Sequence, residues 1–126
     1  MRILIVDDIQ ISRLVIKNIL NDLGFKNTID VSNGFSALAN LKSKIIDCVI
    51  TSWEMPEMSG LELLTQMKAD NLLKNIPVLI AIESSVVEII ISASKAGASG
   101  FLVKPFNKEV FSKKLNEILL KKNNYY

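Results

Sequence analysis

Short apolar runs alternate with longer amphipathic segments along the 126-residue chain. Most of the apolar runs are continuous and carry no polar residue at every second position. A continuous apolar run is typical of a strand that is buried on both faces, as in a parallel sheet covered by helices. The pattern therefore predicts buried strands over residues 3–6, 28–31, 47–51, 76–82 and 101–103.

The amphipathic segments repeat their apolar residues at helical spacing. Glycines follow two of them, Gly24 and Gly97, where they can end a helix. Ser32 or Asn33 can cap the second helix, and Asn107 can cap the last one. The predicted helices cover residues 11–23, 34–41, 61–67, 85–96 and 107–120.

Alternation of strands and helices predicts an α/β fold with a doubly wound parallel sheet of five strands. We expect one domain over residues 1–126, because this length suits a single domain. Crossovers between parallel strands are expected to be right-handed. In such sheets functional residues collect beyond the carboxyl ends of the strands.

The polar residues that follow the predicted strands form a small set. Two carboxylates facing a lysine would make a pocket for a hard cation such as Mg²⁺. An ion-paired cluster at the sheet edge is an equally good interpretation of the spacing alone. The residues at the strand ends are Asp7 and Asp8, Ser52 to Glu54, Ile82 and Glu83, and Lys104 and Pro105.

Composition narrows the function classes. Hydrophobic residues make up 49% of the chain and charged residues 22%, so a packed core is expected. The net charge of +2 favours neither nucleic-acid nor membrane binding. The chain has no histidine, which excludes histidine-based catalysis and metal ligation. A single cysteine, Cys48, and no apolar segment near 18 residues predict a cytoplasmic location.

Three segments resemble the receiver domain of bacterial response regulators, in order and at the right spacing over essentially the whole chain. They are ILIVDD at 3–8, VITSWEMPEMSGLELL at 49–64 and KAGASGFLVKPF at 95–106. The resemblance is to the single-domain, CheY-like class. It implies a flavodoxin-like (βα)5 fold with strand order 2-1-3-4-5 and a cis bond before Pro105.

The resemblance also implies a set of site residues. In the family, a kinase histidine passes a phosphoryl group to an aspartate at the end of the third strand, where this chain has Ser52. Mg²⁺ is held there by the acceptor, by the residue equivalent to Asp8 and by the backbone carbonyl at the position of Glu54. Lys104 matches the lysine that contacts the phosphoryl oxygens.

Two further positions correspond to the family's switch, and at one of them, Ile82, this chain departs from the family's residue type. A serine or threonine that moves toward the phosphate corresponds to Ile82, and an aromatic residue that swings inward corresponds to Phe101. Ile82 has no hydroxyl, and its apolar side chain suits a dianion poorly. The alternative is that Ile82 is only a buried strand residue with no part in signalling.

Ser52 changes the chemistry of the pocket. A serine hydroxyl needs a base to become a good nucleophile, and a normally ionised Asp8 is a weak one. We therefore expect no enzymatic activity, no cofactor and at most a weak Mg²⁺ site at Asp8 and Glu54. Lys104 is expected to pair with Asp7 or Asp8 without a metal. Trp53 is expected to pack beside the pocket.

The fourth predicted helix is apolar on more than one side, which is unusual for a surface helix. We expect at least one of Val86, Val87 and Ile89 to be exposed as part of a docking face. Isolated exposed apolar residues are also common without any function. The expected partners are a histidine kinase, another receiver, or a flagellar or other downstream target, with the chain a monomer or weak homodimer.

The favoured hypothesis is a phosphorylation-independent receiver that works by protein contacts. The alternative is an ordinary phosphoacceptor of a phosphorelay, in which this chain is an aspartate-to-serine variant or uses another acceptor. A flavodoxin-like cofactor binder is a weaker third interpretation, because no glycine-rich phosphate loop follows the first strand.

Overall fold

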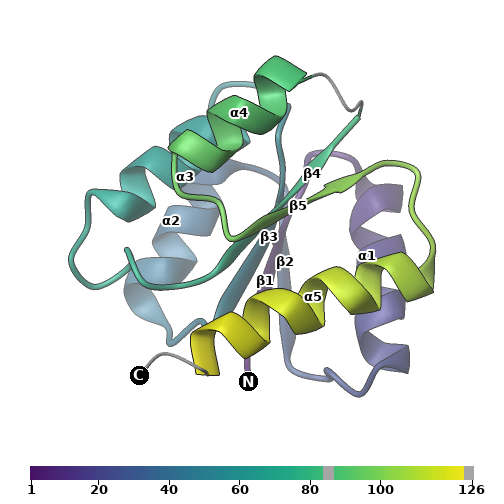
Figure 1. Cartoon of the computed structure of the whole chain (residues 1–126). Coiled ribbons are helices and arrows are strands. Elements are labelled where there is room, and N and C mark those ends of the chain that lie inside the picture. The colour runs from purple at the N-terminus through teal and green to yellow at the C-terminus, as the bar shows by residue number, and fades with distance from the viewer. Residues whose placement is uncertain (84–86, 124–126) are drawn as a thin grey trace.

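The computed structural model describes residues 1–83 and 87–123, and within them the chain forms one parallel sheet. The strand order is β2-β1-β3-β4-β5, as the resemblance implied. Figure 1 shows the strands at the centre of the molecule with helices on both sides. The strands are β1 Ile3–Val6, β2 Thr28–Val31, β3 Cys48–Ser52, β4 Val78–Ile82 and β5 Gly100–Val103.

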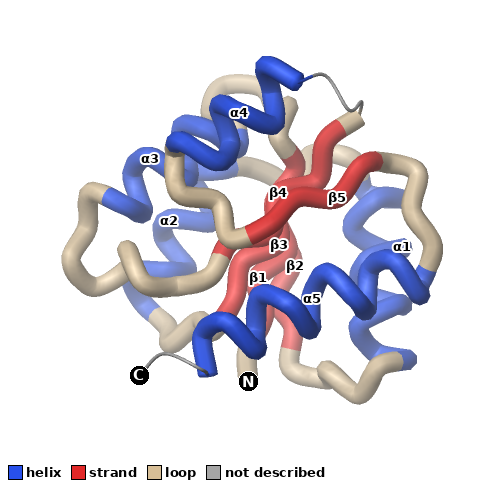
Figure 2. The backbone as a smooth tube through the Cα atoms, in the orientation of Figure 1, coloured by secondary structure: helices blue, strands red, loops and turns tan. Residues whose placement is uncertain are grey.

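Five helices of the described residues cover the two faces of the sheet (Figure 2). One face packs against α1 and α5, and the other against α2, α3 and α4. Two covered faces explain why the central strands β1 and β4 are entirely apolar. The helices are α1 Gln10–Asp22, α2 Gly34–Ser43, α3 Gly60–Lys68, α4 Val87–Lys95 and α5 Lys108–Asn123.

Alternate side chains of each central strand enter the two halves of the core. In β1, Ile3 and Ile5 pack toward α1 and α5, and Leu4 and Val6 pack toward α2, α3 and α4. All four are 0% exposed. The sheet therefore anchors the ends of its strands rigidly, which is what a site built from those ends requires.

The predicted helix ends are confirmed where the structure describes them. Asn33 caps α2, because its side-chain oxygen accepts the backbone N–H of Ser36 at 2.8 Å. Asn107 accepts the N–H of Val110 at 2.8 Å in the same way at the start of α5. Gly24 and Gly97 follow α1 and α4 with φ of 95° and 98°, a left-handed conformation that favours glycine.

Several predicted boundaries were wrong by one to three residues, the largest difference being at the end of α5, which lies at Asn123. β3 begins at Cys48, because the carboxylate of Asp47 accepts the backbone N–H of Arg2 at 2.7 Å and forms a loop contact. β4 begins at Val78, since Pro77 has no N–H to donate. The predicted start of the fourth helix at residues 85 and 86 lies outside the described residues.

Candidate functional site at the carboxyl edge of the sheet

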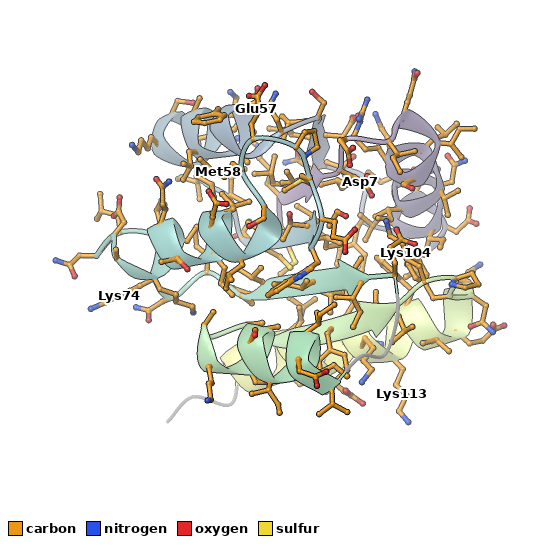
Figure 3. All side chains as sticks on the ribbon, turned by 90° about the horizontal axis from the view of Figure 1, so that it is seen from above. Asp7, Glu57, Met58, Lys74, Lys104 and Lys113 are labelled. Carbon is orange, nitrogen blue, oxygen red and sulfur yellow. The ribbon has the colours of Figure 1, made fainter. Side chains whose placement is uncertain are left out.

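The strand register brings the predicted site residues to one edge. Val6 pairs with Thr51 and Ser52 pairs with Ala81, so the ends of β1, β3 and β4 lie side by side. Ile82 pairs with Val103 at the end of β5. The loops that follow these strands therefore converge on the same edge, which Figure 3 shows from above.

The core of the site is an ion pair between β1 and β5. The ammonium of Lys104 lies 3.1 Å from Oδ2 of Asp7 and donates a hydrogen bond to it. The two side chains are 13% and 2% exposed. Asp7 Oδ1 accepts the backbone N–H of Ile9 at 2.9 Å. The predicted pairing of Lys104 is confirmed with Asp7, while Asp8 is exposed.

Glu83 is a second partner of Lys104. Its place after the fourth predicted strand put it at the edge of the sheet, but no sequence pattern indicated a function for it. Its Oε1 atom lies 3.5 Å from the lysine ammonium, and its side chain is 60% exposed. The sequence could have predicted this contact, because Glu83 directly follows β4 and Lys104 directly follows the neighbouring strand β5. One lysine thus bridges a buried and an exposed carboxylate.

Arg13 supports the same loop from α1 and was not predicted. Its guanidinium donates to the backbone carbonyl of Asp7 at 2.6 Å and pairs with the carboxylate of Asp30 at 3.2 Å. The arginine ties the end of β1 to the end of β2. No motif in the sequence pointed to this role, because it depends on α1 lying across the two strand ends.

Ser52 lies at the end of β3 and is 6% exposed. Its hydroxyl donates a hydrogen bond to the backbone carbonyl of Glu54 at 3.3 Å. The loop beyond it is held by the N–H of Trp53, which donates to Ala81 O at 2.9 Å, and by the N–H of Gly60, which donates to Trp53 O at 2.8 Å. The serine hydroxyl is therefore engaged with backbone rather than with a base.

A cavity of about 460 Å³ opens beside Ser52. Its lining includes the predicted metal ligands Asp8 and Glu54. Trp53 lines it as well and also packs against the core, which confirms that this indole lies beside the pocket. The remaining lining residues are Ile9, Met55, Pro56, Ser59 and Glu83.

The two predicted switch residues lie away from this cavity. Ile82 is 1% exposed and belongs to the core beneath α2, α3 and α4. Phe101 packs against the same core, and the ammonium of Lys114 on α5 lies 5.3 Å from its ring centroid. Ile82 is thus a buried strand residue, and whether it takes part in signalling stays a prediction. The bond between Lys104 and Pro105 is cis, as the resemblance implied.

The residues around Ser52 do not fit a divalent cation well. Within residues 1–83 and 87–123, no group of three or more Asp, Glu, His or Cys side chains is arranged to hold a metal. Mg²⁺ requires near-octahedral oxygen ligation, usually with carboxylates. Here the Asp7 carboxylate is occupied by Lys104, and the Glu54 carbonyl already accepts the Ser52 hydroxyl. The further carboxylates of the predicted ligand set are the side chains of Asp8 and Glu54, and both are exposed.

The predicted docking face is partly visible in the structure. Val87 is 63% exposed, which confirms that at least one of the three named residues is accessible. Ile89 is partly buried and packs against the core, and Val86 lies outside the described residues. Ile91 on α4 and Val103 on β5 add exposed fractions of 47% and 36%.

No helix among the described residues has the length and apolar character to cross a membrane.

Comparisons with known proteins agree with this geometry. The profile of the response regulator receiver domain matches residues 3–116. Chemotaxis protein CheY-3 of Vibrio cholerae is 45% identical over 118 residues, covering 94% of this chain and 91% of that protein. Chemotaxis protein CheY of Pseudomonas aeruginosa is 43% identical over 123 residues, covering 98% and 99%.

Solved structures give the same result. The chemotaxis response regulator CheY4 of Vibrio cholerae superimposes with a TM-score of 0.86 at 30% identity, over 93% of this chain and 97% of that one. A receiver domain of a histidine kinase from Syntrophus aciditrophicus gives 0.88 at 29% identity, over 99% and 94%. With the profile matching nearly the whole chain and the fold and edge residues in agreement, this protein belongs to the response regulator receiver domain family.

Proposed function

We propose that this protein is a chemotaxis-type receiver domain that acts through protein contacts without accepting a phosphoryl group itself. The observation that carries the proposal is the state of Ser52. Its hydroxyl takes the place of the family's acceptor carboxylate and donates to the Glu54 carbonyl. A hydroxyl bonded to a carbonyl has no base to remove its proton.

The surroundings of Ser52 support this proposal. The chain has no histidine to serve as a general base. Asp7 is engaged by Lys104 and by a backbone N–H, so its carboxylate is not directed at the serine. A serine at this site therefore lacks the activating partner on which nucleophilic hydroxyls in proteins depend.

The cellular role follows from this family membership and the charge. The named relatives are chemotaxis proteins, so we propose a cytoplasmic signalling role with a histidine kinase, another receiver or a flagellar or other downstream protein as the partner. A net charge of +2 gives no case for nucleic acid or membrane as partner. We propose no catalytic activity.

The phosphate proposal predicts that the intact protein gains no phosphate when incubated with Mg²⁺ and acetyl phosphate. The Ser52→Asp variant is the matched control, and it is expected to gain one phosphate that hydroxylamine removes, because the carboxylate is already ionised and Lys104 is in place. Intact-mass spectrometry checks both. A hydroxylamine-labile phosphate on the unmodified chain would establish the alternative, an ordinary phosphoacceptor.

The contact proposal predicts that Val87→Glu weakens binding to the partner kinase or receiver by at least about tenfold, since an apolar contact at the centre of an interface is worth 1–2 kcal/mol or more. Leu14→Glu on α1 is the matched control, because Leu14 is 54% exposed on the opposite face of the sheet. Calorimetric titration with the purified partner measures both. Equal affinities for wild type and Val87→Glu would remove the exposed end of α4 from the docking face.

A further inference from the structure

We propose that Lys104 is the resident cation of this edge of the sheet and that the domain does not bind a divalent metal ion at physiological concentrations. The family's Mg²⁺ supplies positive charge between carboxylates at the sheet edge. In this chain the lysine ammonium already lies between two carboxylates, 3.1 Å from Asp7 and 3.5 Å from Glu83. The exclusion of a metal ion rests on the proposed function, in which Ser52 takes the place of the acceptor carboxylate.

The first support is the occupancy of the oxygen ligands. Asp7 uses one carboxylate oxygen for Lys104 and the other for the N–H of Ile9. The carbonyl of Glu54 accepts the hydroxyl of Ser52. A metal ion at these oxygens would compete with the donors already bound to them. The carboxylates that line the cavity belong to Asp8, Glu54 and Glu83, whose side chains are exposed and screened by solvent.

The second support is electrostatic. Lys104 is only 13% exposed, so its charge is weakly screened within the pocket. A divalent ion bound at the Glu83 carboxylate, which lines the cavity 3.5 Å from the Lys104 ammonium, would be repelled by that ammonium. Moving the lysine aside would leave Asp7 without its counter-ion, and Asp7 is 1% exposed. Breaking a buried pair in this way is strongly unfavourable.

The loss of the acceptor carboxylate decides the balance between lysine and metal. With an aspartate in place of Ser52, the pocket would gain a charged oxygen that no donor in the described structure occupies. Asp8 and that carboxylate together would form the pair of charged ligands that Mg²⁺ sites usually have. The serine hydroxyl is neutral and points at the loop, so the lysine remains the cation of the site.

Trp53 provides the measurement, since it is the one tryptophan of the chain and lines the cavity. We expect its fluorescence and the melting temperature of the full chain to show no saturable response to millimolar MgCl₂. The Ser52→Asp variant should show a saturable response to MgCl₂ in both measurements. Its affinity for Mg²⁺ should be at least roughly tenfold higher than any residual affinity of the wild type, because even changes to residues around the ligands of a metal site lower metal affinity tenfold or more.

Ser59→Asp is the matched control. It places a carboxylate on the same cavity at the cap of α3, where aspartate also caps well. This variant should stay unresponsive, because its carboxylate is not at the strand end. A saturable response of the wild type, an unresponsive Ser52→Asp variant, or an equal response of Ser59→Asp would each overturn the inference.

Metal binding and phosphate transfer are measured separately, so the experiments can contradict the resident-cation inference and the proposed function independently. Magnesium binding by the wild type without a phosphate adduct would overturn the resident-cation inference and leave the proposed function standing. A phosphate adduct on the wild type without a saturable magnesium response would overturn the proposed function and leave the resident-cation inference standing.

Discussion

Lys104→Ala is expected to lower the free energy of unfolding by about 3–5 kcal/mol, the usual cost of removing one partner of a buried ion pair. The substitution leaves the carboxylate of Asp7 buried, with only the Ile9 N–H as a donor. It also removes the contact between the end of β5 and the end of β1. Lys104 and Asp7, which make this contact, are 97 positions apart in the sequence. Urea unfolding at neutral pH, followed by circular dichroism, measures the change.

Lys108→Ala is the control for this effect. Lys108 pairs with Asp22 at 3.8 Å, and the two side chains are 52% and 60% exposed. An exposed pair of this kind contributes at most about 1 kcal/mol, so the control should unfold nearly as the wild type does.

A rescue variant separates the lost charge pair from lost packing. Adding Asp7→Asn to Lys104→Ala removes the buried charge while keeping an oxygen for the N–H of Ile9, so part of the stability should return. If Lys104→Ala were no more destabilising than Lys108→Ala, the pair would not be the central contact of the edge.

Gly60→Ala is expected to cost at least about 1–3 kcal/mol, because overpacking against backbone forces the chain to shift. A Cβ atom on Gly60 would lie 2.3 Å from the backbone oxygen of Ser52 and 3.0 Å from the Cα atom of Trp53. The N–H of Gly60 also donates to Trp53 O at 2.8 Å. The substitution should therefore shift the Trp53 fluorescence as well as lower the urea midpoint.

Gly34→Ala is the matched comparison for Gly60→Ala. A Cβ atom on Gly34 would meet the side chain of Met58, with its sulfur 2.5 Å away. A methionine side chain is flexible and can move, so this change should cost less than the one at Gly60 and leave the Trp53 emission unchanged. A larger loss at Gly34 would contradict the view that contact with backbone is decisive.

Local patterns were sufficient for most of the fold. Continuous apolar strands can only be buried on both faces, and the glycines and asparagines at helix ends have specific backbone roles. The predicted ends of the strands were wrong where a single tertiary contact decides them. Asp47 reads as the start of a strand, yet its carboxylate is bound to the N–H of Arg2, 45 positions away.

The candidate site divides in the same way. Residue types at strand ends were enough to find Asp7, Asp8, Ser52 and Lys104, because all parallel strands end at one edge. Lys104 pairs with Asp7 rather than Asp8 because the Asp7 carboxylate points inward. The spacing of apolar and polar residues along the chain does not specify which of the two carboxylates does so. Arg13 reaches the Asp7 carbonyl only because α1 crosses the end of β1.

By itself, the sequence of this protein determined the parallel α/β architecture and the presence of a serine, Ser52, at the end of the third strand, because periodicity and residue identity are local properties. Only the tertiary structure decided that the Ser52 hydroxyl bonds to the Glu54 carbonyl and that Ile82 lies in the core rather than at the pocket. It also decided that Lys104 bridges Asp7 and Glu83. Those contacts join residues far apart along the chain, and they exist only once the five strand ends meet.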